Sequence, residues 1–239
     1  MTEDLFSQLD LSIGKSMAGD KDAVVGSKNA VVGNNDAAQK IPIADGELTL
    51  YPHCFSTAEA DHYFAQLQET IAWSQEKISM YGKTHNVPRL SAWYSDDGIP
   101  YTYSGITAYG LAWTESLQVI KTRVEQLAAT HFNSVLANLY RDGADSVSWH
   151  ADDEAELGPA PVIASVSLGQ ERIFQLKHKF DKTLKTNVLL PHGSVLVMRG
   201  ATQRHWLHQI AKSRRAMSPR INLTFRWVDK CLAEASVKR

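Results

Sequence analysis

The second half of the chain alternates apolar and polar residues in short runs that are separated by turn residues. This alternation has the two-residue period of a strand. It predicts strands over residues 134–140, 146–150, 161–168, 172–178, 186–190, 194–198, 205–210 and 219–227. No helical pattern interrupts the series, so a parallel α/β fold is disfavoured. A run of short strands with regular turns is typical of a sandwich or a jelly roll.

Two segments that precede these strands have the spacing of helices instead. Ser56 and Glu59 are placed as a capping box at the start of one helix, and a second helix is expected from Thr114. The apolar stripes consist of Tyr63, Phe64, Leu67 and Ile71 in the first helix, and of Leu117, Ile120, Val124, Leu127 and Ala128 in the second. We expect both helices to pack on one outer face of the strands. The predicted fold class is mainly β with flanking helices, an α+β arrangement.

Composition divides the chain into a tail and a folded domain. Residues 1–40 are rich in Ala, Gly, Asp, Asn and Ser and contain no aromatic residue after Phe6, so we expect a disordered tail. Residues 41–230 are expected to form one domain, followed by a C-terminal tail over 231–239. The first fifty residues carry eight acidic and four basic side chains, which leaves 18 acidic and 21 basic ones in the remainder. The folded part is mildly basic, which permits contacts with phosphate without requiring them.

The expected compartment is the inside of a cell. The sequence has no apolar run of about 18 residues that would span a bilayer, and its start lacks the features of a signal peptide. Cys54 and Cys231 are too few for a disulfide framework, which agrees with a reducing compartment. We expect a monomer without a membrane partner, in the nucleus of a eukaryote or the cytoplasm of a bacterium.

The first candidate for chemistry is the run His150-Ala-Asp152. Side chains two residues apart in a strand point the same way, so this imidazole and carboxylate could share a metal ion. His205 and His208 are candidates for a third ligand, and on a strand they point to opposite faces, so only one of them can reach the ion. Two histidines and one carboxylate leave three positions of an octahedral ion open, as in non-haem Fe(II) oxygenases. Taken alone, the spacing is also that of ordinary polar residues at a strand end.

The last predicted strand has one apolar and one polar face. The apolar face consists of Ile221, Leu223, Phe225 and Trp227, and the polar face of Arg220, Asn222, Thr224 and Arg226. A solvent-facing side would explain such a strand. Alternatively, two guanidinium groups beside an amide and a hydroxyl suit a small dicarboxylate, because guanidinium binds carboxylate through two parallel hydrogen bonds. Asn138 and Tyr140 place an amide and a phenol on one face of another strand in the same way.

Together these motifs resemble the AlkB family of Fe(II)/2-oxoglutarate-dependent nucleic-acid dealkylases. The motifs are Asn138-x-Tyr140, His150-x-Asp152-Asp153-Glu154, His208 and Arg220-x-Asn222-Leu-Thr-x-Arg226, and the resemblance covers roughly residues 78–228. It implies a double-stranded β-helix, or jelly roll, in which His150, Asp152 and His208 bind Fe(II). The 2-oxoglutarate site implied by the resemblance lies beside His208 and consists of Asn138, Tyr140, Arg220, Asn222, Thr224 and Arg226. O₂ is the other implied substrate.

The resemblance also implies the reaction and the nucleic-acid contacts. The expected activity is oxidative demethylation of N1-methyladenine and N3-methylcytosine in DNA, with release of formaldehyde and succinate, on a base flipped out of the duplex. Tyr81-Gly82-Lys83 resembles the aromatic finger of the animal branch that repairs duplex DNA, with Tyr in place of Phe. Leu90-Ser-Ala-Trp-Tyr94 is closer to the branch that prefers single strands, so single-stranded DNA is a further expected partner. The residues expected to contact the flipped base are Tyr101, Thr102, Tyr103, Asp153 and Glu154.

Two other functions are compatible with parts of this pattern. A 2-oxoglutarate oxygenase that acts on RNA, a protein or a small molecule needs the same iron and cosubstrate residues, although the finger and the aromatic hairpins are superfluous for a small substrate. A non-catalytic β-barrel that retains a metal for stability is expected to have lost a ligand or an arginine, and this sequence has lost neither.

Overall fold

The computed structural model describes residues 38–80, 83–103 and 106–237. Most of the tail expected at residues 1–40 lies outside these ranges, and Gln39 already belongs to the first strand. No helix in the described ranges is long and apolar enough to cross a membrane.

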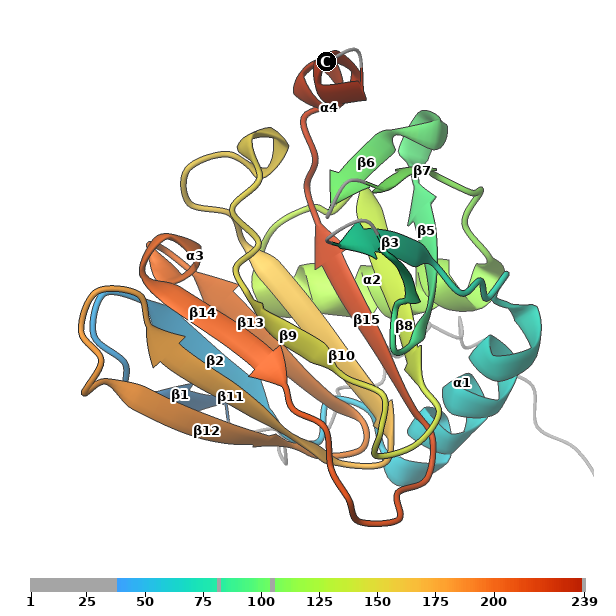
Figure 1. The fold of residues 1–239 in the computed structure, drawn as a ribbon. Coiled ribbons are helices and arrows are strands. Elements are labelled where there is room, and N and C mark those ends of the chain that lie inside the picture. The colour runs from blue at the N-terminus through green and yellow to red at the C-terminus, as the bar shows by residue number, and fades with distance from the viewer. Residues whose placement is uncertain (1–37, 81–82, 104–105, 238–239) are drawn as a thin grey trace, which may run out of the picture. The chain divides into compact units, whose positions relative to one another are not determined.

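Two antiparallel sheets form the centre of the domain (Figure 1). The larger sheet has the order β1-β2-β13-β10-β15-β8-β5 and the smaller sheet the order β12-β11-β14-β9. The larger sheet contains β1 (Gln39–Ile41), β2 (Glu47–Tyr51), β13 (Ser194–Arg199), β10 (Ile163–Gly169), β15 (Arg220–Arg226), β8 (Ser134–Tyr140) and β5 (Leu90–Ser95). The smaller sheet contains β12 (Lys185–Leu190), β11 (Arg172–His178), β14 (Trp206–Ile210) and β9 (Val147–His150).

The two sheets share one buried apolar cluster. The larger sheet contributes Leu48, Leu50, Ile163, Leu196 and Met198, and the smaller sheet contributes Phe174, Leu176, Val188, Trp206 and Ile210. The inward residues alternate along their strands, as the two-residue period requires. The jelly-roll architecture predicted from the sequence is confirmed, and each predicted strand is present to within two residues at its ends.

Two helices cover the other face of the larger sheet. The second buried cluster joins Leu67, Leu117, Ile120 and Val124 of α1 (Thr57–Thr70) and α2 (Glu115–Ala128) to Val135, Ala137, Val166, Ile221 and Leu223 of the sheet. The predicted capping box begins α1: Glu59 N–H donates to the hydroxyl of Ser56, and Ser56 N–H donates to the carboxylate of Glu59. Thr114 caps α2 by accepting a hydrogen bond from the N–H of Leu117.

Two hairpins flank β5. The first consists of β3 (Lys77–Met80) and β4 (Lys83–Asn86), and a bridge between Ser74 and Ser91 joins the segment before it to β5. The second consists of β6 (Pro100–Tyr103) and β7 (Ile106–Tyr109), after which Leu111 bridges to Tyr94 of β5. Two short 3₁₀ turns, η1 (Asp96–Gly98) and η2 (Ala155–Leu157), complete the connections.

Three details differ from the sequence expectations. His205 does not extend a strand, because its N–H bonds to the carbonyl of Ala201 and closes the helix α3 (Thr202–His205). Trp227 lies beyond the end of β15 and is 57% exposed, so it does not share the buried apolar face of that strand. Where a C-terminal tail was expected, residues 230–237 form the helix α4 (Lys230–Val237), and its Ala233 is buried.

Candidate active site

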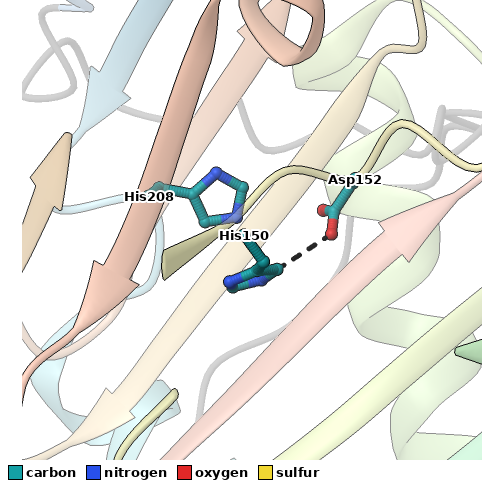
Figure 2. Close-up of side chains that lie close together, drawn as sticks. All are labelled: His150, Asp152 and His208. Carbon is teal, nitrogen blue, oxygen red and sulfur yellow. Dashed lines mark ion pairs between the residues drawn. The ribbon is translucent and has the colours of Figure 1, made fainter. Parts of the chain in front are cut away.

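Three potential metal ligands, His150, Asp152 and His208, lie together (Figure 2). His150 on β9 and His208 on β14 are register partners, and their ring centroids are 4.3 Å apart. Asp152 follows β9, and its Oδ1 lies 3.9 Å from Nε2 of His150. One potential ligand atom from each of the three residues lies within 4.8 Å of the other two. In the described ranges, no other set of three or more His, Cys, Asp or Glu residues meets this distance. Two imidazoles and one carboxylate at this spacing match the facial triad of Fe(II) oxygenases.

Asp152 is held by contacts from outside β9, and not by the strand alternation that the sequence suggested. β9 ends at His150. The N–H of Asp152 donates to Oε1 of Gln203 at 3.0 Å, and Nη2 of Arg226 lies 3.0 Å from its Oδ2. A backbone anchor and an ion pair therefore direct this carboxylate to the two imidazoles.

The surroundings of the triad set its charges. Burial acts to raise the pKa of Asp152, but neighbouring positive charge, foremost that of Arg226, lowers it to about 2, so the carboxylate is ionised at neutral pH. Burial lowers the pKa of His208 to about 3, which keeps this imidazole neutral. Nδ1 of His150 lies 2.8 Å from the carbonyl oxygen of Ser148, and a proton donated there leaves the Nε2 lone pair free. An ionised carboxylate and a neutral imidazole are the states in which Asp152 and His208 can bind a metal ion.

His205, the other candidate for the third ligand, lies elsewhere. Its ring is nearly parallel to that of His178, with the ring centroids 5.7 Å apart. It also lies edge-on to the ring of Phe180, with the ring centroids 5.9 Å apart. Among the described residues, His208 is the histidine that joins His150 and Asp152.

The polar face of β15 lines a pocket that adjoins the triad. Its walls include Asn138, Tyr140, Arg220, Asn222, Thr224 and Arg226, together with the three potential ligands. The structure thus brings together the whole set that the sequence assigned to 2-oxoglutarate. Arg220 is only 1% exposed, which excludes a solvent-facing explanation of this face.

Arg220 has the contacts of a side chain that requires an anionic ligand. Its Nη2 donates to Oγ of Ser167 at 2.8 Å, whereas Nε and Nη1 are buried without a hydrogen-bond partner among the described residues. Burial lowers the pKa of Arg220 to about 10, so the group remains cationic at neutral pH. A buried cation without a paired anion is strongly unfavourable, and a carboxylate bound at this guanidinium would supply the missing negative charge and accept from its unused donors. The donor set therefore fits a carboxylate of 2-oxoglutarate.

Asn222 and Thr224 have much of their hydrogen-bonding capacity occupied within the protein. The Asn222 amide nitrogen donates to Oγ of Ser165 at 2.8 Å and to the carbonyl of Val166 at 2.9 Å. Thr224 Oγ1 donates to Oδ1 of Asn222 at 3.1 Å. These two side chains therefore shape the wall of the pocket. The unused donors of the set belong to the two arginines, and of these Arg226 already forms an ion pair with Asp152, which leaves Arg220 as the cation without a paired anion.

Arg89 also belongs to the site, although the sequence analysis did not find it. Its Nε donates to Oδ1 of Asn138 at 2.8 Å, its Nη1 donates to the carbonyl of Ser146 at 3.3 Å, and it lines two adjoining pockets. In the sequence it is one arginine between Pro88 and Leu90 at the start of a strand, which is a weak signal.

A second pocket, of ≈ 370 Å³, adjoins the first at His150 and Asp152. Both pockets are lined by Arg89, Leu136, Val147, His150, Asp152 and Arg226. The second pocket adds Tyr101, Trp149 and Glu154 to these. Burial raises the pKa of Glu154, and its buried Oε2 has no hydrogen-bond partner among the described residues. The carboxyl group also hydrogen-bonds to Tyr101, so its Oε2 is the atom available to a polar or cationic ligand.

The remaining residues expected at the base have different surroundings. Tyr101 is 2% exposed and stacks on Trp93 with centroids 4.6 Å apart, so it frames the second pocket with little ring face left for a base. Asp153 lines neither pocket and instead forms an ion pair with Lys179 at 2.7 Å. Tyr81 and Gly82 lie outside the described residues, and Lys83, Thr102 and Tyr103 are placed only as backbone positions in β4 and β6.

Comparison with protein families decides the class of this site. The model of the 2OG-Fe(II) oxygenase superfamily matches residues 47–226. The chain belongs to this superfamily. Its cofactors are accordingly Fe(II), 2-oxoglutarate and O₂, and the residues of the first pocket fit them. The oxygenase is 41% identical over 196 residues to alpha-ketoglutarate-dependent dioxygenase alkB homolog 3 of Homo sapiens, which covers 78% of this chain and 68% of the relative.

A second relative and two solved structures extend the comparison of this oxygenase. DNA oxidative demethylase ALKBH2 of Mus musculus is 38% identical over 193 residues, which covers 77% of this chain and 81% of the relative. The structure of OsALKBH1 matches with a TM-score of 0.56 at 18% identity, over 75% of this chain and 97% of that one. A prolyl hydroxylase from Trichoplax adhaerens matches with a TM-score of 0.55 at 12% identity, over 81% of this chain and 88% of that one. At these low identities the two structures support the fold alone.

Proposed function

We propose that this oxygenase removes methyl groups from alkylated DNA bases, with N1-methyladenine and N3-methylcytosine as substrates and formaldehyde and succinate as products. The observation that carries the proposal is the second pocket, which meets the 2-oxoglutarate pocket at His150 and Asp152. A substrate bound there would present its methyl group at the metal ligands. The name of one relative, DNA oxidative demethylase ALKBH2, supports DNA as the substrate.

In this proposal the first pocket orients the cosubstrate. Arg220 holds one carboxylate of 2-oxoglutarate, with Asn138 and Tyr140 beside it. His150, Asp152 and His208 hold the metal ion. Fe(II), 2-oxoglutarate and O₂ together supply an oxidant that hydroxylates the methyl group, after which the product releases formaldehyde. The side chains bind and orient the reactants, and no side-chain nucleophile is required.

The second pocket has the chemistry of a site for a cationic base. Methylation at N1 of adenine or N3 of cytosine gives the base a positive charge and weakens its pairing, which lowers the cost of flipping it out of a duplex. Glu154 presents an unpartnered carboxyl oxygen in this pocket, and a bound cation would favour its ionised form. Tyr101 supplies an aromatic wall.

The contacts with the rest of the nucleic acid are assigned to the hairpin of β3 and β4. The segment Tyr81-Gly82-Lys83 would fill the gap that the flipped base leaves in the stack and would hold a nearby phosphate. Thr102 and Tyr103 follow Tyr101 in β6 and are proposed as further base contacts. The protein is proposed to act as a monomer, in the nucleus of a eukaryote or the cytoplasm of a bacterium.

A comparison of substrates tests the proposed function. Succinate formation from 2-oxoglutarate would be measured with methylated DNA as a single strand and as a duplex, with methylated RNA of the same sequence, and with unmethylated DNA. We expect methylated DNA to stimulate turnover and unmethylated DNA to leave it at the basal rate. Stimulation by RNA alone would assign the enzyme to RNA, and no stimulation by any nucleic acid would overturn the proposal.

A further inference from the structure

The C-terminal helix α4 lies against the elements that carry two walls of the second pocket. It contacts β6, which carries Tyr101, and η2, which directly follows Glu154. We propose that α4 positions these two walls and thereby determines how the base binds, with Ala233 as the positioning residue. The inference rests on the demethylase function proposed above and adds a determinant of substrate binding to it.

Hydrogen bonds fix the start of α4 to the domain. The side chain of Asn133 donates to the carbonyl of Val228 and accepts from its N–H, both at 2.8 Å. The N–H of Asp229 donates to the carbonyl of Glu156 in η2 at 2.8 Å. The Asp229 carboxylate then accepts from the N–H of Leu232 at 3.1 Å, which caps the helix. The position of α4 is therefore tied directly to that of η2.

Ala233 is the packing contact of the helix. It is 2% exposed and lies in a buried cluster with Trp93, Tyr101, Leu157 and Val228. This cluster contains the stacked pair of Trp93 and Tyr101 as well as Leu157 of η2. The small side chain of Ala233 thus allows α4 to support both walls at once, and a larger or charged side chain there would displace the helix.

The candidate metal ligands and Arg220 of the first pocket are held by contacts outside α4, and Leu136, which lines both pockets, is the residue that also belongs to the cluster of Ala233. His150 and His208 are placed by the pairing of β9 with β14, and Asp152 by Gln203 and Arg226. Arg220 lies in β15, between β10 and β8. Displacement of α4 is therefore expected to change the binding of the base and to spare the binding of 2-oxoglutarate.

Two matched variants test this assignment. Ala233→Asp places a carboxylate in the buried cluster, and Ala235→Asp places the same group at an exposed position of the same helix. Because an unpaired buried charge is strongly unfavourable, the short terminal helix is expected to leave its site while the remaining domain stays folded. The KM for a methylated oligonucleotide should rise about ten-fold or more in Ala233→Asp, since small misplacements of positioning groups cost up to about 100-fold.

The KM for 2-oxoglutarate should stay within about two-fold of the wild type in the same preparation. Binding of the methylated oligonucleotide without turnover, measured by fluorescence anisotropy, should weaken by the same factor as its KM rises. Ala235→Asp should match the wild type in all three quantities. A chain that ends at Val228 lacks α4 altogether and decides the question if Ala233→Asp fails to fold.

The possible outcomes separate this inference from the proposed function. A rise in the oligonucleotide KM with an unchanged 2-oxoglutarate KM supports the positioning role of α4. Parallel losses for both substrates, or an unchanged oligonucleotide KM in the chain that ends at Val228, would overturn it. If methylated nucleic acid does not stimulate turnover by the wild-type enzyme, the proposed function is overturned together with this inference.

Discussion

His150 and His208 face one another across the antiparallel pair of β9 and β14, with their ring centroids 4.3 Å apart. The pairing has an irregularity between His208 and Ile210, where two residues separate His150 from Val147 on the facing strand. A bulge of this kind re-aims the side chains next to it. A shift of one residue in this register would turn one imidazole to the outer face of the sheet. Strand pairing within the smaller sheet therefore places the two imidazoles of the candidate metal site.

The first prediction separates the two neighbouring histidines. His208→Ala should abolish iron binding and succinate formation, because it removes one of three ligands, and should leave the fold intact. His205→Ala is the matched control, since its ring lies against His178 and Phe180 and outside the triad. Iron content after dialysis and succinate formation would be measured for both variants. Loss in His205→Ala with retention in His208→Ala would reverse the ligand assignment.

The second prediction concerns the buried guanidinium groups. Arg220→Ala should raise the KM for 2-oxoglutarate roughly 30-fold or more, since loss of one partner of a buried charge pair costs about 2–5 kcal/mol. Arg172 is also buried, but its guanidinium donates to the backbone carbonyls of Asp142, Asp145 and Ala211. Arg172→Ala should therefore lower the melting temperature without a comparable change in KM. An unchanged KM in Arg220→Ala would contradict the assignment of this pocket to the cosubstrate.

The third prediction is a pH dependence of stability away from the active site. An ion pair between Arg123 of α2 and Glu59 of α1 joins the two helices, with Nη2 of the arginine 2.8 Å from Oε1 of the glutamate. The hydrogen bond from Arg123 is the main reason why the pKa of Glu59 falls from 4.5 to about 2. Because the pKa is lower in the folded state, the stabilisation is complete above the unfolded-state value of 4.5 and is lost as the pH falls toward about 2. Glu59→Gln keeps a residue that suits the capping box but removes the charge.

We expect Glu59→Gln to lower the free energy of unfolding by about 0.5–1 kcal/mol at neutral pH, the range of a partly exposed ion pair. The difference in unfolding free energy from the wild type should shrink as the pH falls below 4.5, the pKa of an unperturbed glutamic acid. Urea unfolding of both proteins over this pH range measures it. A difference that is independent of pH would mean that the ion pair does not cause the stabilisation.

The fourth prediction addresses the proposed finger. Tyr81→Ala should impair turnover of duplex substrates roughly ten-fold or more, because stacking of an aromatic ring on a base is worth on the order of 1–3 kcal/mol. Single strands present no stack to refill and should be nearly unaffected. Both substrates would be assayed on one preparation. Equal losses on the two substrates, with a lower melting temperature, would instead indicate a residue that packs on its own domain.

The sequence predicts the strands well because they depend on local periodicity, whereas His208 was distinguished from His205 by the family resemblance and not by spacing. Contacts between segments that are distant along the chain are harder to predict from the sequence. Arg89 reaches Asn138 from the segment before β5, and Asp152 depends on Gln203, so neither contact leaves a periodic signal. The C-terminal helix was missed because it is short and depends on the burial of Ala233 in a cluster formed by distant segments.

The most direct test of the account is the fate of the methyl group itself. An oligonucleotide with one N1-methyladenine would be incubated with the enzyme, Fe(II) and 2-oxoglutarate in air, and formaldehyde, succinate and the base would be quantified together. We expect unmodified adenine, formaldehyde and succinate in equal amounts from the wild type, and none of them from His150→Ala. Succinate formation that proceeds at the same rate without the oligonucleotide, with the methyl group retained on the base, would contradict it.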